Sequence, residues 1–475
     1  MSKTLTPDIC VIGAGSGGLS VAAAAAAFGV EVVLVEKGKM GGDCLNYGCV
    51  PSKAILAAGK QAQTMRDGEK FGISSVEPEI DYEKVNEHIK GVIAAIEPND
   101  SVERFTGLGV QVIQAEGKFS DATTLVAGDN EIRARRFVVA TGSSAFVPPI
   151  PGLDKVPYLT NESIFENKQK IEHLIVIGGG PIGMEMAQAH RRLGSEVTVI
   201  EAQTALGQSD PELSEIVLDR LRKEGIKILD SASVSSVAAN GSNGIKAEYE
   251  LDGKLQTVSG SHILVATGRA ANVSGLDLEK AGIEFDRRGI KTSPDLRTTN
   301  KRVYAIGDVA GGPQFTHVAG YHAGLVIRGI LFRQRAVPDH ENIPWVTFTD
   351  PELANVGLSE NQAREKYGEV QVLKWPYHEN DRAQAERKTE GFIKLITAKR
   401  GRIVGVGIAG ANAGEMINMW SLAITNKMKL KNVIGYVSPY PTMSEIGKRA
   451  AITSYSPLAK KPLIRWIIGF LRRFG

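Results

Sequence analysis

The chain contains a long internal repeat. Residues 8–37, DICVIGAGSGGLSVAAAAAAFGVEVVLVEK, align without a gap on residues 173–202, HLIVIGGGPIGMEMAQAHRRLGSEVTVIEA. Each copy has an apolar strand pattern, a G-x-G-x-x-G turn, a helical stretch, a second apolar strand and an acidic residue at its end. The offset of 165 residues pairs Gly13, Gly15, Gly18 and Glu36 with Gly178, Gly180, Gly183 and Glu201.

This order of elements predicts two dinucleotide-binding βαβ units. The first glycine allows the tight turn, the second lets the backbone approach a pyrophosphate, and the third lets the helix pack on the strand. The helix N-terminus faces the phosphate charge. The acidic residue is placed to accept hydrogen bonds from a ribose hydroxyl. A single G-x-G-x-x-G is weak evidence, but here the complete unit occurs twice.

A second pair of similar segments supports this architecture. FVVATG ends at Gly142 and ILVATG ends at Gly268, and each is expected to lead from an apolar strand back toward its nucleotide. From residue 343 the pattern changes to that of an α+β domain. The fold class is therefore α/β, with two doubly wound, Rossmann-like domains and a C-terminal α+β domain. We expect the first domain at 1–155 and 272–342, the second, inserted domain at 156–271, the third at 343–455, and a basic tail at 456–475.

Charge, apolar runs and cysteine content exclude several classes of protein. The net charge of +3 is too small to indicate a nucleic-acid partner. No apolar run approaches the about 18 residues of a spanning helix, and the strand at Asp8 follows the N-terminus too closely for a signal peptide. Three cysteines are too few for a secreted disulfide scaffold. We therefore expect a cytoplasmic protein.

Two of these cysteines lie in GGDCLNYGCVPSK, residues 41–53. A structural zinc site needs four Cys or His ligands and an iron–sulfur cluster generally four cysteines; three cysteines, with Cys10 inside the first strand, cannot supply them, so we expect no metal. A structural disulfide between Cys44 and Cys49 remains an alternative to a reversible dithiol. Pro51 favours a helix start here, and both that helix and Lys53 would favour a Cys49 thiolate. Cys10 is expected to be a buried core residue.

The chain resembles the FAD-dependent pyridine nucleotide–disulfide oxidoreductases, which include dihydrolipoamide dehydrogenase, glutathione reductase and mercuric reductase. The resemblance extends from Asp8 to about Ala451 and is carried by GGDCLNYGCVPSK, VYAIGDVAG and PYPTMSEIGKRAA. It implies a homodimer formed through the C-terminal domain. It also implies that the first nucleotide site holds FAD and that the second holds the nicotinamide cofactor.

The resemblance also implies individual residue roles. The FAD site would use Gly13, Gly15, Gly18, Glu36, Lys53, Gly117, Gly142, Asp308 and Thr316. The nicotinamide site would use Gly178, Gly180, Gly183, Glu201 and Gly268. Glu201 favours NADH over NADPH, because an acid repels a 2′-phosphate.

By the same resemblance, electrons would pass from NADH through FAD to the Cys44–Cys49 disulfide. Cys49 would be the sulfur nearer the flavin, Cys44 would attack a disulfide acceptor, and Lys53 would pair with Glu185. We expect an acceptor of the dihydrolipoamide type. A mercuric reductase-like metal-ion acceptor, a quinone at a membrane surface, and a non-enzymatic flavin-holding scaffold are the alternatives.

Two positions depart from the family pattern. Tyr440 stands where disulfide-reducing relatives place a histidine base, while Glu445 keeps the acid that accompanies that base. Tyrosine, with a pKa of about 10, is a poor base at neutral pH, so we expect weak lipoamide turnover. Mercuric reductases share the tyrosine, but they carry a C-terminal cysteine pair that this chain lacks. Asp43 replaces a threonine of many relatives and is expected to raise the pKa of Cys44, or to be a turn residue.

The last residues form a basic apolar segment, LIRWIIGFLRRF at 463–474. On a helical wheel, Arg465, Arg472 and Arg473 share one side with Gly469. This pattern fits an interfacial helix that contacts a membrane peripherally, or a helix packed on its own dimer.

Overall fold

The computed structural model describes residues 3–241 and 244–474. These residues form two compact units. Unit 1 comprises the described residues within Met1–Gln63, Glu77–Ala202 and Leu229–His340. Unit 2 comprises those within Thr64–Val76, Gln203–Ile228 and Glu341–Gly475.

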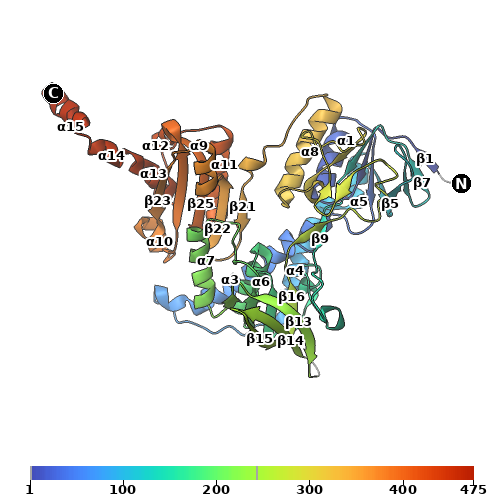
Figure 1. Cartoon of the computed structure of the whole chain (residues 1–475), viewed down its shortest axis with the longest axis horizontal. Coiled ribbons are helices and arrows are strands. Elements are labelled where there is room, and N and C mark those ends of the chain that lie inside the picture. The colour runs from blue at the N-terminus through green and yellow to red at the C-terminus, as the bar shows by residue number, and fades with distance from the viewer. Residues whose placement is uncertain (1–2, 242–243, 475) are drawn as a thin grey trace. The chain divides into compact units, whose positions relative to one another are not determined.

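Unit 1 contains a five-stranded parallel sheet in the order β20-β8-β2-β3-β4. Its strands are β2 (Ile9–Ile12), β3 (Val32–Glu36), β4 (Gln111–Gln114), β8 (Arg136–Val139) and β20 (Val303–Ala305). The central strand β2 is buried along its whole length, as a parallel strand covered on both faces requires. Helices α1 (Ser16–Ala27) and α8 (Thr316–Leu331) pack on one face of this sheet and form a buried core with it (Figure 1). The other face packs on a small sheet of β1 (Lys3–Leu5), β5 (Gly117–Phe119), β6 (Leu125–Ala127) and β7 (Asn130–Ile132).

The second copy of the repeat builds a second parallel sheet in unit 1. Strand β10 (His173–Ile177) pairs with β11 (Glu196–Ile200) and with β16 (His262–Val265). Helix α6 (Pro181–Arg192) connects β10 to β11, with Pro181 in its first turn. A three-stranded antiparallel sheet shares a core with this sheet; its strands are β13 (Ser233–Asn240), β14 (Gly244–Leu251) and β15 (Lys254–Gly260).

Unit 2 is built on a five-stranded antiparallel sheet in the order β21-β22-β25-β24-β23. Its strands are β21 (Trp345–Thr347), β22 (Glu352–Gly357), β23 (Gln371–Pro376), β24 (Phe392–Ala398) and β25 (Arg402–Gly410). A core around buried Trp420 joins the sheet to α11 (Ala413–Thr425), α12 (Leu430–Gly435) and α13 (Glu445–Ile452). The chain thus has the α/β class with a C-terminal α+β part that its sequence predicts.

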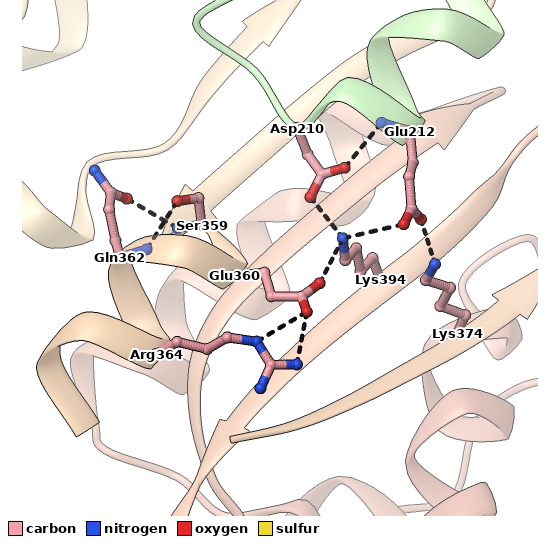
Figure 2. Close-up of polar contacts among 8 residues, drawn as sticks. All are labelled: Asp210, Glu212, Ser359, Glu360, Gln362, Arg364, Lys374 and Lys394. Carbon is pink, nitrogen blue, oxygen red and sulfur yellow. Dashed lines mark hydrogen bonds and ion pairs between the residues drawn. The ribbon is translucent and has the colours of Figure 1, made fainter. Parts of the chain in front are cut away.

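Helix α7 (Pro211–Lys223) groups with this C-terminal sheet, although the sequence assigns its residues to the nicotinamide domain. The contact includes ion pairs. Lys394 on β24 reaches from the sheet to Asp210 and Glu212 at the start of α7, as Figure 2 shows. The proposed domain boundaries remain a prediction, because a compact unit and an evolutionary domain need not coincide.

Candidate functional site

The two cysteines of the redox loop, residues 41–53, lie on two consecutive helices. Cys44 is within α2 (Gly42–Asn46), and Cys49 is the first residue of α3 (Cys49–Arg66). Gly41 and Gly42 both have positive φ, of 84° and 61°. A Cβ at Gly42 would lie 2.7 Å from the Cα atom of Gly15, so the redox loop rests directly on the first glycine-rich turn.

The two thiols have opposite acidities. A hydrogen bond from Cys44 lowers the pKa of Cys49 to about 6, with help from Thr316 and the positive charge of Lys53. The Sγ atom of Cys49 lies 3.3 Å from Oγ1 of Thr316, the first residue of α8. The same hydrogen bond with Cys49, together with burial, raises the pKa of Cys44. Cys49 is therefore the thiol that ionises first, while Cys44 keeps its proton.

Lys53 is one turn beyond Cys49 on α3 and forms an ion pair with Glu185 of α6. Its Nζ atom lies 2.7 Å from Oε2 of Glu185, whose side chain is only 6% exposed. The pair joins the redox helix to the helix of the second glycine-rich turn. A buried carboxylate needs such a partner, and the lysine in turn brings a positive charge to the neighbourhood of Cys49.

The first glycine-rich turn has the geometry of a nucleotide cradle. Gly13 has φ of 103°, and a Cβ there would meet the carbonyl oxygen of Ala140 at 2.5 Å. A Cβ at Gly18 would lie 1.9 Å from the oxygen of Gly13, so helix and strand pack without room for a side chain. Only Gly15 faces open space, with nothing nearer than Gly42 at 4.0 Å. Glu36 at the end of β3 accepts a hydrogen bond from the backbone N–H of Ala14 at 2.6 Å.

The second turn repeats this geometry. Gly178 has φ of 109°, and a Cβ at Gly183 would meet the oxygen of Gly178 at 2.0 Å. Gly180 has no atom within 4 Å of its Cβ position. Glu201 accepts from the N–H of Gly179 at 2.6 Å, the counterpart of the bond between Glu36 and Ala14. Both cradles therefore leave an open position at the middle glycine, where a diphosphate could approach the backbone.

The remaining expected nucleotide residues lie around these turns. Gly117 on β5 packs against Val35, next to Glu36. Gly142 and Gly268 both have positive φ, and neither has an atom within 4 Å of its Cβ position. Asp308, in the short helix Gly307–Ala310, accepts a hydrogen bond from Oγ of Ser143 at 2.5 Å. Burial raises the pKa of Asp308.

Three further residues of this region, Ser143, Asn161 and Arg269, are absent from the sequence-based prediction. Arg269 donates to the side chain and the carbonyl oxygen of Ser143, both at 2.7 Å, and Asn161 is buried beside the redox loop. The position of Arg269 immediately after ILVATG was a usable signal, because that crossing point is expected beside a nucleotide. Ser143 directly follows Gly142 in the equivalent segment. Nothing in the sequence around Asn161 indicated its place.

The structure gives Asp43 partners that the sequence did not predict. Its carboxylate points to Arg269 at 3.1 Å and accepts from Asn161 at 3.1 Å. The negative charge of Asp43 raises the pKa of Cys49, where it opposes the effect of Lys53. The pKa of Cys44 is also raised, chiefly by its hydrogen bond to Cys49 and by burial.

Tyr440 and Glu445 lie in unit 2 and engage other partners. The hydroxyl of Tyr440 donates to Oδ2 of Asp381 at 2.8 Å, and this carboxylate raises the pKa of Tyr440. Glu445 begins α13 and pairs with Arg449 at 2.8 Å. Tyr440 therefore holds its proton more firmly than a free tyrosine does, so even less of it is the phenolate that could accept a proton at neutral pH.

The residues of unit 1 fit two dinucleotides. The two open glycine positions, each with an acid at the neighbouring strand end, each fit the diphosphate of a dinucleotide. Bound FAD would supply two-electron chemistry next to the Cys44–Cys49 pair. Among residues 3–241 and 244–474, no group of three or more His, Cys, Asp or Glu residues is arranged to hold a metal ion. Within the same residues, no helix combines the length and apolarity needed to cross a membrane.

Comparisons with known proteins agree with this geometry. Residues 7–323 match the family model described as pyridine nucleotide-disulphide oxidoreductase, and residues 343–451 match the dimerisation domain of the same enzymes. The chain is 36% identical to a mercuric reductase of Bacillus cereus over 95% of its own length and 72% of the relative. It is 34% identical to a dihydrolipoyl dehydrogenase of Bacillus subtilis, covering 94% of this chain and 95% of the relative.

Solved structures show the same likeness. The HOCl-induced flavoprotein disulfide reductase RclA of Escherichia coli superposes with a TM-score of 0.84 at 26% identity, over 94% of this chain and 99% of the other. LpdA of Mycobacterium tuberculosis superposes with a TM-score of 0.87 at 26% identity, again over 94% and 99%.

Proposed function

The chain belongs to the pyridine nucleotide-disulphide oxidoreductase family of flavoproteins, and from that premise we propose that it passes electrons from NADH through FAD to the Cys44–Cys49 couple and on to a disulfide of the dihydrolipoamide class. The observation that carries this proposal is the low pKa of Cys49 at the start of α3, beside Cys44, Thr316 and Lys53. The dimerisation-domain match supports a homodimer.

The two cysteines of the redox loop have different roles once the disulfide is reduced. When two electrons break the Cys44–Cys49 bond, one sulfur becomes a thiolate and the other takes a proton. The hydrogen bond between the two sulfurs and the charge of Lys53 assign the thiolate to Cys49. The pKa of Cys44 is raised, so Cys44 takes the proton. Cys44 must lose this proton again before it attacks an external disulfide.

The loss of this proton limits the choice of acceptor. A general base contributes roughly 10²–10⁴-fold to such a step, and the raised pKa of Tyr440 makes that residue unfit to be the base. We therefore expect slow turnover of lipoamide. A soft metal ion binds thiolates directly and needs no such base, which favours a mercuric reductase-like metal-ion acceptor as the second candidate. An acceptor screen with lipoamide, glutathione disulfide, a quinone and Hg²⁺ separates these candidates.

The charge-transfer band of the reduced enzyme tests the relay itself. We expect anaerobic NADH to produce a two-electron reduced form with a thiolate-to-flavin absorbance, because the lowered pKa of Cys49 favours its thiolate. The variant Cys49→Ser should lose this band, whereas Cys44→Ser should keep it. Complete bleaching of the flavin without the band would favour direct reduction of a quinone. An unreduced flavin would favour the scaffold.

The same titration compares NADH with NADPH. We propose that NADH is the substrate, because the carboxylate of Glu201 is held at the end of β11 beside the second cradle. A 2′-phosphate at that position would meet a like charge. We expect a higher kcat/KM with NADH, and a reduced preference in Glu201→Gln. A higher kcat/KM with NADPH in the unmodified enzyme contradicts this assignment.

The C-terminal tail has a separate proposed role as a contact to a lipid surface. None of the residues of α15 (Pro462–Leu471) is buried. Trp466 is 68% exposed and stacks on Phe470, which in turn contacts Phe474. The segment 460–474 carries five basic residues and no acidic one. This combination favours an anionic membrane surface, where the aromatic side chains enter the headgroup region and the basic ones meet lipid phosphates.

A further inference from the structure

Asp43 connects the redox loop to more distant parts of unit 1. It precedes Cys44 in α2, and its two carboxylate oxygens face different partners. Oδ2 lies 3.1 Å from Nη2 of Arg269, and Oδ1 accepts from Nδ2 of Asn161 at 3.1 Å. These partners are 226 and 118 residues away in the sequence, so this position of the carboxylate exists only in the folded chain.

The carboxylate also lies against the residue before Cys49. A Cβ at Gly48 would come within 2.9 Å of Oδ2 of Asp43, so this glycine leaves the space that the side chain of Asp43 occupies. Asn161, which is buried, donates a second hydrogen bond to the carbonyl oxygen of Tyr47 at 3.1 Å. The backbone between Cys44 and Cys49 is thus contacted by both Asp43 and Asn161.

The contacts continue beyond Arg269 to the flavin side of unit 1. Arg269, with a side chain only 12% exposed, donates to Oγ of Ser143 at 2.7 Å. The hydroxyl of Ser143 donates to Asp308 at 2.5 Å. A continuous set of polar contacts therefore joins the redox loop to Asp308, which the family resemblance places at the flavin.

We propose that Asp43 is a positioning residue for the redox disulfide, that Arg269 and Asn161 hold it, and that its carboxylate is the fixed negative charge beside which the Cys49 thiolate has to form. The proposal rests on the proposed role of Cys49 as the redox thiol. Threonine, which the resemblance places at this position in many relatives, carries no charge and offers Arg269 no ion pair. This chain would therefore hold a less acidic Cys49 than a threonine-bearing version of itself.

The groups around Cys49 support this balance of charges. Its pKa is lowered by the hydrogen bond from Cys44, by that from Thr316 and by the charge of Lys53, and it is raised by burial and by Asp43. Lys53 is partly neutralised by Glu185, and Asp43 by Arg269. Besides burial, Asp43 also raises the pKa of Asp308. Replacing Asp43 with a neutral side chain should hence favour the ionised form of both groups.

The test measures how the ionisation of Cys49 depends on pH. The reduced holoenzyme is alkylated with iodoacetamide across a range of pH from acid to neutral, and peptide mass spectrometry gives the rate constant for Cys49. The midpoint is the pH at which the rate constant reaches half of its plateau value. We expect Asp43→Asn and Asp43→Thr to shift this midpoint to lower pH. At about pH 5 the rate constant should rise about threefold, the size expected for one carboxylate several ångströms away in a partly hydrated site. Asp43→Glu keeps the charge and should stay close to the unmodified enzyme.

Asn161→Ala is the matched control. It removes the two hydrogen bonds that Asn161 donates to Asp43 and to the carbonyl oxygen of Tyr47, and it leaves the charge of Asp43 in place. Because the ion pair with Arg269 remains, its midpoint should move less than that of Asp43→Asn. An unchanged or raised midpoint in Asp43→Asn overturns the proposal, as do equal shifts in Asp43→Asn and Asn161→Ala. Alkylation needs neither NADH nor turnover, so failure of the electron relay would be seen separately, as the absence of the charge-transfer band in the unmodified enzyme.

Discussion

At the scale of single residues, the environment of a side chain decides its chemistry more than its type does. Cys44 and Cys49 are the same residue type in one short loop, yet one pKa is raised and the other is lowered to about 6. The histidine His190 on α6 is a second case. It is 5% exposed, and among the described residues its Nε2 atom has no hydrogen-bond partner.

Burial of His190 predicts a loss of stability in mild acid. Burial, with a smaller contribution from His262, lowers the pKa of His190 from 6.5 to about 4. The unfolded chain therefore binds more protons than the folded one between these values. The contribution of His190 to stability is most favourable above pH 6.5 and falls as the pH drops toward 4.

We expect the free energy of unfolding to be about 2 kcal/mol lower at about pH 5 than at about pH 7.5 because of His190. His190→Leu should reduce the acid-induced loss by that amount, measured by urea unfolding at both pH values. The variant His88→Ala, at an exposed histidine, is the control for replacing a histidine at the surface. Identical pH dependence in His190→Leu and the unmodified chain would show that the histidine does not titrate in this way.

At the scale of elements, a buried lysine joins a helix to a sheet. Lys394 on β24 is 4% exposed and lies 2.7 Å from Asp210, 2.9 Å from Glu360 and 3.8 Å from Glu212 (Figure 2). Although burial lowers the pKa of Lys394, its hydrogen bonds to Asp210 and Glu360 raise it overall. Asp210 also caps α7 by accepting from the N–H of Glu212 at 3.0 Å. One ammonium group thus holds α7, β24 and α9 (Glu360–Tyr367) together.

Removing this ammonium should destabilise unit 2 strongly. Lys394→Met leaves Asp210, whose side chain is 11% exposed, without its cation, and we expect a loss of about 3–5 kcal/mol. Lys374 pairs with Glu212 at the edge of the same cluster, but its side chain is 44% exposed. Lys374→Met should cost less than about 1 kcal/mol. Urea unfolding of the two variants gives the comparison, and similar small losses in both would show that the buried cluster contributes little.

At the scale of the whole molecule, the tail is the segment whose proposed partner is a lipid surface. We expect the full chain to sediment with vesicles that contain phosphatidylglycerol and not with vesicles of phosphatidylcholine alone, because its basic residues meet the anionic headgroups. The emission of Trp466 should shift to shorter wavelength on binding. Binding should weaken as salt is added.

Two variants separate this role from packing within a dimer. A chain ending at Ser456 should no longer sediment with the vesicles, and replacement of Arg465, Arg472 and Arg473 by Glu should abolish sedimentation while the helix is kept. Both should remain dimers by light scattering, because the dimerisation-domain match ends at residue 451. A truncated chain that becomes monomeric would instead place the tail in the dimer interface.

The sequence alone determined the local features of this protein. Two glycine-rich turns and the acids that follow them predicted both cradles, because the first and third glycines of each turn are required by the backbone of their own βαβ unit. The start of α3 at Cys49 was equally local, since Pro51 and the helix-forming residues after it are contiguous. These signals sufficed for the α/β class, whereas the redox role of Cys44 and Cys49 was implied by the family resemblance and stays a prediction.

Only the tertiary structure decided which side chains meet. Cys49 contacts Thr316 across 267 residues, Lys53 pairs with Glu185 across 132, and Asp43 forms an ion pair with Arg269. Parallel strands end at a common sheet edge, so loops remote in sequence converge there, and side-chain direction then selects the partners. Charge interactions depend on these distances and not on sequence spacing. For that reason the balance of charges around Cys49 could be stated only from the folded chain.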